Sequence, residues 1–361
     1  QIILSLGGVI QKPGTDFTVS GSTLTFTTAP AANTSFFAIL LGSDNGGTVT
    51  PTDGSVTGDK VASTGAFTIG AAGTASNLAG IPFYRNDTSS IYTHDVSGTD
   101  DTAALNTAYG ITALDAITTG DNNTVVGSGA GSALNTGHRN TLMGQGAGSL
   151  LTTATHTVAI GNAAASGYDT EIHNVAIGHV ALGGSVAGGE YNVAVGSVSL
   201  DALTSGDGNV GVGYGTASTL TTGDYNVAVG YESMHGGVTT GDMNTCVGYR
   251  TGYDLTSGAG NTFIGDRCGF ECTTSSNNSV VGIYAGYNLT TGDGGNSLLG
   301  YAAGYTMTTG VNNTCLGYDA GRAGSPGGNI TTGSHNVSLG DDRVLTLNAQ
   351  VSLSVASDKR D

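Results

Sequence analysis

Four aromatic residues recur in the C-terminal half of the chain at intervals of 17 or 18 residues. They are Tyr253, Phe270, Tyr287 and Tyr305. Aromatic rings in a row can hold sugar rings against them, so one hypothesis is that these residues bind a glycan on a cell surface. The alternative is that the rings only stack on one another or pack between chains, which would make their role structural.

Residues suited to acid–base chemistry are sparse. Glycan cleavage generally needs two carboxylates across a cleft, and the chain has only four glutamates in 361 residues. Its seven histidines have no consistent cysteine or carboxylate partner, and no nucleophile-elbow motif is present. We therefore predict that the chain is not an enzyme and needs no cofactor. A β-helical polysaccharide depolymerase is the enzymatic alternative.

The sequence also lacks metal-binding patterns. Its four cysteines include no C-x-x-C pair and are expected to be buried thiols. Aspartates follow several turns, but each repeat usually supplies one carboxylate whereas calcium needs six to eight oxygen ligands. We predict no metal site and interpret these aspartates as solvated turn residues. They are Asp121, Asp207, Asp224, Asp242 and Asp293.

The composition excludes several classes of partner. The net charge is −17, and the three lysines lie outside the repeats described below. Nucleic acid and anionic membrane surfaces both require clustered basic residues, so neither is an expected partner. The longest apolar run, 36–41, is far shorter than a membrane-spanning helix, so we expect no membrane insertion. Because the chain begins with Gln1 and not Met, we expect a fragment or a processed product.

The aromatic spacing belongs to a repeat that covers residues 106–340. Its motif is Asn-Thr/Val-x-apolar-Gly, recurring every 17 or 18 residues except for a last interval of 23. Thr157 replaces the asparagine once, before Gly161. The other pairs are Asn106 and Gly110, Asn123 and Gly127, Asn140 and Gly144, Asn174 and Gly178, Asn192 and Gly196, Asn209 and Gly213, Asn226 and Gly230, Asn244 and Gly248, Asn261 and Gly265, Asn278 and Gly282, Asn296 and Gly300, Asn313 and Gly317, and Asn336 and Gly340.

The pattern of each repeat predicts one short strand followed by turns. The residues between Asn and Gly alternate as in a strand, the Gly permits a sharp turn, and Thr-Thr-Gly closes the unit. A unit this short cannot bury its own apolar face, so the units must stack, with identical positions above one another. Stacked asparagines can then hydrogen-bond along the axis. With strands about 4.8 Å apart, fourteen coils predict a rod about 65 Å long.

The fold class predicted is all-β, a parallel β-roll or β-helix solenoid after a small antiparallel module. A thin rod of this kind gains burial by association, and we expect a homotrimer with closed symmetry. Within each strand, the residue two before Gly is often small and the residue one before Gly is large and apolar. One of these faces should meet the coil interior and the other the partner chains, and the sequence leaves open which is which.

The flanking segments differ from the repeats. Residues 1–43 read as a small β module with strands at 1–9, 17–19, 23–27 and 35–41. Residues 44–105 are rich in Gly and Thr and read as a connector with weak strand signals at 67–69 and 81–84. Residues 341–361 should hold a terminal strand at 343–355 and a charged end.

Three resemblances agree with this organisation. Residues 7–42, through Gly-Val-Ile-Gln-Lys-Pro-Gly-x-Asp-Phe and Thr-Phe-Thr-x-Ala-Pro, resemble the small β domains of bacteriophage tail-fibre shafts. The repeats resemble the Asn-x-Val-Ala-Ile-Gly coils of trimeric autotransporter adhesin heads, which are left-handed parallel β-rolls, although the units here are longer. Residues 357–360, Ser-Asp-Lys-Arg, resemble the start of an endosialidase-type intramolecular chaperone, in which the Ser–Asp bond is cut. That resemblance implies self-cleavage between Ser357 and Asp358, with the chaperone domain itself lying beyond this chain.

Together the resemblances imply a structural viral tail fibre that forms an elongated rod for host attachment. Its expected partners are two further copies of itself, other virion tail proteins through the N-terminal region, and a host cell-surface glycan or protein. Its expected location is the virion, exposed to the extracellular medium. The alternative is the head of a bacterial trimeric autotransporter-type adhesin, which would have the same stacked-coil architecture.

Overall fold

A computed structural model describes residues 2–20, 23–40, 76–78, 81–83, 90–93, 102–167, 169–184, 188–292, 294–325 and 327–344. These residues form strands and turns and no helix, which confirms the all-β prediction. Consequently no helix in the described ranges is long and apolar enough to cross a bilayer. The chain divides into two compact units, Gln1–Thr68 and Ile69–Asp361.

The N-terminal unit is the predicted small antiparallel module. The prediction of a single strand over 1–9 is wrong, because Gly7 and Gly8 both have positive φ and form a two-residue turn that splits it. The resulting strands give a three-stranded sheet in the order β2-β1-β5 and a separate β3-β4 hairpin. They are β1 (Ile2–Leu6), β2 (Val9–Gln11), β3 (Phe17–Ser20), β4 (Thr23–Phe26) and β5 (Phe36–Leu40).

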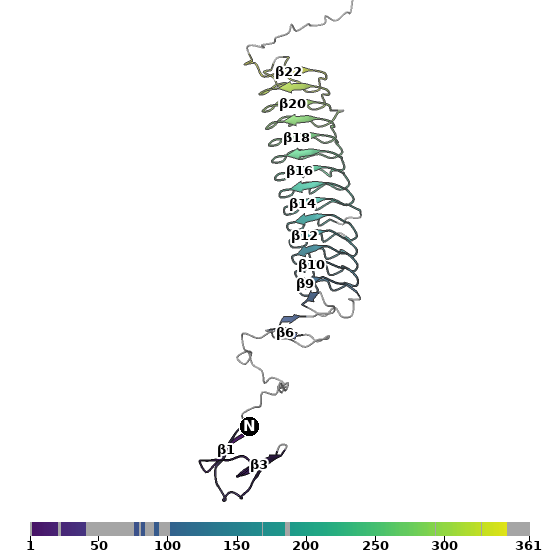
Figure 1. Cartoon of the computed structure of the whole chain (residues 1–361). Coiled ribbons are helices and arrows are strands. Elements are labelled where there is room, and N and C mark those ends of the chain that lie inside the picture. The colour runs from purple at the N-terminus through teal and green to yellow at the C-terminus, as the bar shows by residue number, and fades with distance from the viewer. Residues whose placement is uncertain are drawn as a thin grey trace, which may run out of the picture. The chain divides into compact units, whose positions relative to one another are not determined.

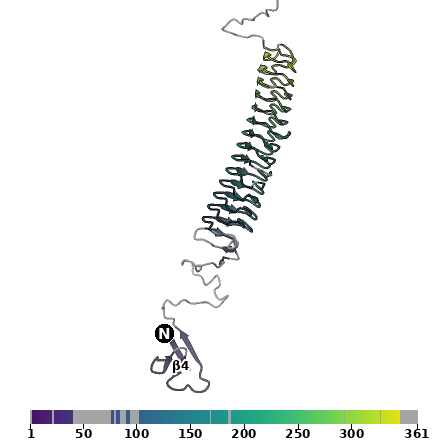
Figure 2. The same ribbon diagram turned by 90° about the vertical axis from the view of Figure 1, so that its right-hand side faces the viewer.

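The second unit begins with a hairpin and continues as a solenoid (Figures 1 and 2). Strands β6 (Ser76–Leu78) and β7 (Ile81–Phe83) pair antiparallel, and β8 (Ile91–Tyr92) starts a 15-stranded parallel sheet in chain order. The sheet therefore reaches into the segment expected to be a connector. The further strands are β9 (Thr107–Tyr109), β10 (Thr124–Val126), β11 (Thr141–Met143), β12 (Val158–Ile160), β13 (Val175–Ile177), β14 (Val193–Val195), β15 (Val210–Val212), β16 (Val227–Val229), β17 (Thr245–Val247), β18 (Thr262–Ile264), β19 (Ser279–Val281), β20 (Ser297–Leu299), β21 (Thr314–Leu316) and β22 (Val337–Leu339).

Some sequence-based predictions fall outside the described residues. The Ser357–Asp358 bond and the weak strand at 67–69 lie wholly outside them. Of the predicted terminal strand, only Arg343 and Val344 are described, and they belong to a turn region and not to a strand.

The structure shows which face of each strand lies inside the coil. The residue two before Gly points into the coil and is fully buried, as at Ala159, Ala176 and Ala194. The large residue one before Gly points outward, so that Ile264 is 40% exposed and Leu299 is 53% exposed. The inward residue is small in several coils and large in others, as at Leu142, Phe263 and Leu298, and it shares the coil interior with a row of leucines. These lie seven after Gly and include Leu134, Leu151, Leu203, Leu220, Leu255 and Leu289, all 0% exposed.

The glycine after each strand is required by the close stacking of successive coils. At Gly127 φ is +136°, in the region that side chains disfavour. A Cβ atom placed there would lie 2.4 Å from the carbonyl oxygen of Gly144 in the next coil. The coils can therefore approach to hydrogen-bonding distance only if this position carries no side chain.

A buried ladder of asparagines joins the coils. Asn226 donates from its backbone N to Oδ1 of Asn209 at 2.8 Å and from Nδ2 to the same oxygen at 3.1 Å. Its Nδ2 also donates to the carbonyl oxygen of Gly241 at 2.9 Å, which closes a turn. Because these amides are almost fully buried, each hydrogen bond stabilises the stack, and each missing one would leave a costly unpaired polar group.

Thr157 interrupts the ladder. Its backbone N still donates to Oδ1 of Asn140 at 2.9 Å, but its buried hydroxyl oxygen has no hydrogen-bond partner among the described residues. Threonine also lacks the amide nitrogen that elsewhere reaches the preceding asparagine and a turn carbonyl. This coil is therefore the weak point of the ladder.

We predict that Thr157→Asn raises the free energy of unfolding by about 1–2 kcal/mol, because it restores buried hydrogen bonds on both sides. Denaturant unfolding followed by circular dichroism measures the change. The reciprocal substitution Asn226→Thr should lower stability by a similar amount. If Thr157→Asn were neutral while Asn226→Thr was destabilising, the missing hydrogen bonds at Thr157 would not be the cause of weakness.

Candidate binding surface

The four predicted aromatic residues come together as a stacked ladder. Tyr253 and Phe270 lie 5.0 Å apart between ring centroids, Phe270 and Tyr287 5.1 Å, and Tyr287 and Tyr305 5.1 Å. Their interplanar angles are 5°, 7° and 15°, so the rings are nearly parallel. Each residue lies five after its coil glycine, and the parallel register therefore places the rings directly above one another. We call these four residues the aromatic ladder.

The ladder covers its ring faces, while its side chains remain partly exposed. Each inner ring has a neighbour on both sides, and the end rings are covered as well: the guanidinium carbon of Arg322 lies 4.9 Å from the centroid of Tyr305, and the ring of His235 lies 5.8 Å from that of Tyr253. Sugar stacking on the ring faces would have to displace these contacts. Glycan binding by the ladder thus stays a prediction, and only its edges and hydroxyl groups are accessible for it.

Beside the C-terminal end of the ladder lies a groove of about 440 Å³. Its walls are Tyr287 and Tyr305 of the ladder together with Tyr284, Tyr301, Arg267, Arg322 and Ala302. We call this feature the tyrosine groove. Tyr284, Arg267 and Arg322 are binding candidates that the sequence alone did not indicate. The position of each residue within its repeat could have indicated that they lie close together. Tyr284 and Arg267 each lie two residues after a coil glycine, and Arg322 lies five residues after Gly317, at the position of the aromatic ladder.

Tyr284 connects the ladder to the other side of the groove. Its ring makes edge contacts with Tyr301 at 6.1 Å and with Tyr305 at 6.4 Å, and a tilted contact with Tyr287 at 5.9 Å. Its hydroxyl accepts a hydrogen bond of 2.9 Å from Nη1 of Arg267. The groove is thereby held by aromatic contacts and one charge-assisted hydrogen bond.

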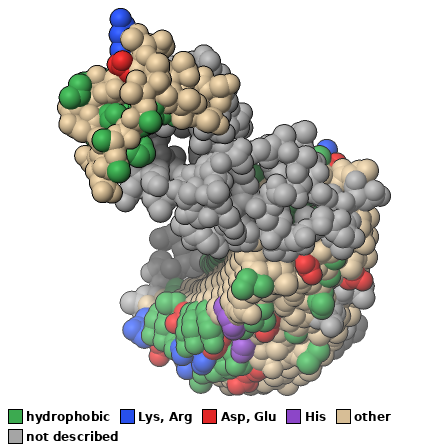
Figure 3. Space-filling view, turned by 90° about the horizontal axis from the view of Figure 1, so that it is seen from below, with side chains coloured by type: hydrophobic (Ala, Val, Ile, Leu, Met, Phe, Trp, Pro, Cys, Tyr) green, Lys and Arg blue, Asp and Glu red, His purple; other side chains and the backbone are tan. Residues whose placement is uncertain are grey.

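Cationic side chains concentrate next to these rings, as Figure 3 shows along one side of the array. Five arginines lie in the described coils, and four of them sit over tyrosine rings. Arg139 is the exception. The four, with the nearest ring of each, are Arg250 at 5.3 Å over Tyr249, Arg267 at 5.1 Å over Tyr249, Arg322 at 4.9 Å over Tyr305, and Arg343 at 5.5 Å over Tyr318.

The turn aspartates bind the backbone of the neighbouring coil. Oδ1 of Asp207 accepts a hydrogen bond of 2.8 Å from the N of Glu190, and Oδ1 of Asp224 accepts one of 2.8 Å from the N of Asp207. They are therefore more than solvated turn residues, because each caps an otherwise unpaired N–H. Asp293 lies outside the described residues. In the described ranges no three His, Cys, Asp or Glu side chains gather as a metal site.

The cysteines are buried inside the coils. Burial raises the pKa of Cys268 and of Cys272 to about 12 and raises the pKa of Cys246 well above its ordinary value. Burial likewise raises the pKa of Cys315, to about 11. All four are thus neutral thiols near pH 7, which neither attack a substrate nor bind a metal in that form.

One serine–histidine pair lies on the surface of the coils. Oγ of Ser218 lies 2.5 Å from Nδ1 of His235, and the same nitrogen lies 2.9 Å from the carbonyl oxygen of Gly215. Asp201 lies one coil before Ser218, and its buried Oδ1 has no hydrogen-bond partner among the described residues. Burial raises the pKa of Asp201, while the charge of His235 lowers it. Glu171, 4% exposed, uses both carboxylate oxygens on backbone N–H groups of Asp169, Thr170 and Gly188. The Glu171 carboxylate therefore holds the surrounding turns in place.

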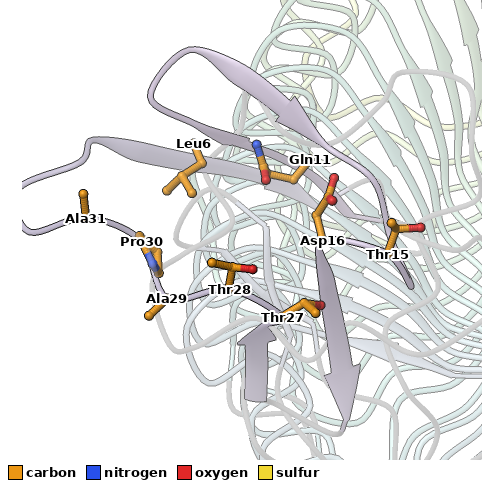
Figure 4. Close-up of a pocket in the computed structure, with 9 residues that line it drawn as sticks. All are labelled: Leu6, Gln11, Thr15, Asp16, Thr27, Thr28, Ala29, Pro30 and Ala31. Carbon is orange, nitrogen blue, oxygen red and sulfur yellow. The ribbon is translucent and has the colours of Figure 1, made fainter.

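The N-terminal module has a hollow of about 310 Å³ (Figure 4). It is lined by small and polar residues, among them Gln11, Thr15 and Thr28. Its carboxylate, that of Asp16, already accepts a hydrogen bond of 2.7 Å from the backbone N of Lys12. This hydrogen bond ties the Asp16 carboxylate to the neighbouring turn.

Comparisons of the chain with protein-family models, with curated proteins and with solved structures found no match.

A second ladder consists of histidines and lies directly before the asparagine positions. The rings of His156 and His173 stack at 4.8 Å, and Tyr191 stacks on His173 at 5.1 Å. Nη1 of Arg139 lies 3.4 Å from Nε2 of His156. Partial desolvation lowers the pKa of His156, an exposed side chain, and the nearby charges of His173, Arg139 and His138 lower it further.

We predict that this part of the array loosens as the pH falls below about 6.5, the ordinary pKa of histidine. Because the folded state lowers the pKa of His156, the unfolded turn binds a proton more readily, and the local stability present at higher pH is lost on acidification. The measurement is hydrogen-exchange protection of the His156 and His173 amides at pH 7.5 and pH 5. A double variant, His156→Asn with His173→Asn, is the control, since Asn occupies the same position at Asn122 and Asn277. An equal loss of protection in the control would contradict the prediction.

Proposed function

We propose that the chain forms the rod of a homotrimeric viral tail fibre that attaches the virion to a host cell surface. The proposal combines the solenoid, the resemblance of residues 7–42 to phage tail-fibre shaft domains, and the surface chemistry of the coils. The observation that carries it is the outward face of the parallel sheet, which bears a continuous apolar stripe.

The stripe consists of the large residues one before each coil glycine, flanked three before the glycine by valine in six coils and by threonine or serine in the other eight. Parallel sheets are normally covered on both faces, because their strands carry apolar side chains on both sides. Here one face is filled by the coil interior, while the outward residues, such as Val212, Ile264 and Leu299, are exposed in the single chain. An apolar stripe of this length in an otherwise polar surface marks a contact between proteins.

Two further copies of the same chain are the occupants that fit the stripe best. Fourteen strands of three residues each present a face of roughly 650 Å², close to the area that each partner contributes to a stable interface. A second copy has the same spacing between coils, so its outward side chains can pack against those of the first copy in one register along the full length. Rotation by a third of a turn closes the assembly and leaves no stripe exposed.

The remaining parts have complementary roles in this proposal. The N-terminal module binds other tail proteins, and the rod carries the recognition surface outward into the medium. The aromatic ladder and the tyrosine groove contact a host cell-surface glycan, since tyrosine hydroxyl groups and arginines can hydrogen-bond sugar hydroxyls.

A trimer predicts a mass in solution three times that of one chain, measured by sedimentation equilibrium. Charges in the stripe, introduced as Val212→Lys together with Ile264→Lys, should dissociate it because they bury unpaired ammonium groups. Met243→Lys is the matched control, since Met243 is exposed but lies outside the stripe. A chain that is monomeric before any substitution would overturn the trimer.

Attachment through the ladder predicts that Tyr253→Ala, Tyr287→Ala and Tyr305→Ala together reduce binding of the labelled fibre to host cells at least about tenfold, the equivalent of one or two lost contacts. Tyr225→Ala is the control, because Tyr225 is exposed in a different row of the coils. Circular dichroism verifies that the variants keep their fold. Unchanged cell binding by a folded triple variant would exclude the ladder as the attachment site.

A further inference from the structure

The tyrosine groove has an unusual charge for this protein. The chain carries a net charge of −17, yet the groove is lined by two arginines, four tyrosines and an alanine, with no carboxylate among them. A ligand in the groove would therefore meet positive charge and hydrogen-bond donors, although the protein as a whole repels anions.

The two arginines are held in place through one nitrogen each. Nη1 of Arg267 donates to the hydroxyl of Tyr284 at 2.9 Å and lies 3.4 Å from Oδ1 of Asp266, while Nη1 of Arg322 donates to Oδ1 of Asp319 at 2.6 Å. A guanidinium group has five N–H donors, so both side chains keep donors on Nε and Nη2. Neither aspartate lines the groove. Their contacts position the guanidinium groups and only partly neutralise them.

The tyrosines add donors and little negative surface. The face of Tyr301 is stacked on Tyr318 at 5.1 Å, and the faces of Tyr287 and Tyr305 are stacked on each other. Negative charge density lies over ring faces and positive density at ring edges, so stacked rings present their positive edges and hydroxyl groups. The walls therefore favour an oxygen-rich anion over a purely apolar ring.

We infer that the tyrosine groove binds a carboxylate-bearing sugar unit of an acidic polysaccharide. The planar guanidinium groups of Arg267 and Arg322 match a carboxylate, and the tyrosine hydroxyls both donate to and accept from sugar hydroxyls. The inference rests on the proposed attachment to host glycans and names the class of glycan. The groove residues follow the strands in the chain and lie in the turns, outside the apolar stripe.

The experiment compares acidic oligosaccharides with uncharged counterparts. Isothermal titration of the full chain with oligomers of galacturonic, guluronic and sialic acid tests binding, and the methyl ester of the galacturonic oligomer removes the charge while retaining the sugar. We expect an acidic oligomer to bind, its ester or a neutral oligomer to bind at least about tenfold more weakly, and added salt to weaken the acidic complex.

Variants assign the binding to the groove. Arg267→Gln and Arg322→Gln should each weaken acidic-oligomer binding about tenfold, because each removes charged hydrogen bonds. Arg322→Lys, which keeps the charge but loses the planar fork, should lie between Arg322→Gln and the parent chain. Arg139→Gln is the matched control, since it makes the same charge change outside the groove. Thermal unfolding verifies that each variant is folded.

The outcomes separate the inference from the proposed function. Equal binding of acidic and neutral oligomers, or equal loss in Arg139→Gln and Arg322→Gln, overturns the acidic-sugar site and leaves glycan attachment standing. Absence of binding to every oligosaccharide and to host cells overturns both. Cell binding that persists without any acidic-oligomer binding overturns the inference alone.

Discussion

Close stacking of one coil on the next is the constraint on which the rest of the solenoid depends. Backbone of one coil approaches backbone of the next so nearly that a Cβ at Gly127 would overlap the carbonyl oxygen of Gly144. At that distance the buried asparagines bridge the coils, as Asn226 does to Asn209. Glycine permits this close approach, which buries backbone polar groups, and asparagine supplies their hydrogen bonds. The glycine and asparagine positions therefore depend on each other.

The same register decides what the surface looks like. Residues at equal positions in successive coils must lie above one another, and a sequence preference at one position becomes a row of like side chains. This explains why Tyr253, Phe270, Tyr287 and Tyr305 stack and why His156 stacks on His173. Stacking also hides the ring faces, so that the proposed recognition would involve ring edges, hydroxyl groups and arginines.

The two surfaces of functional interest arise at different positions of the coil. The apolar stripe comes from the strands, where side chains alternate between the interior and the outside, while the tyrosine groove comes from the turns that follow. Residues at one of these positions can therefore change without altering the side chains at the other. A concentration of arginines on the turns of a strongly acidic chain is the feature that distinguishes the C-terminal coils.

The sequence by itself determined the class and period of the fold, because a unit of 17 residues with one strand and one obligatory glycine can bury its apolar side only by stacking. It also identified the aromatic ladder from spacing. It did not reveal the Gly7–Gly8 turn, the pairing of β8 with β9, or which side of each strand faces inward. Those features depend on how the coil closes, because the inward side of the strands carries residues as small as Ala176 and as large as Phe263, so residue size alone does not identify it. The tyrosine groove likewise required tertiary structure, because Arg267, Tyr284 and Arg322 belong to different coils and meet only through their register.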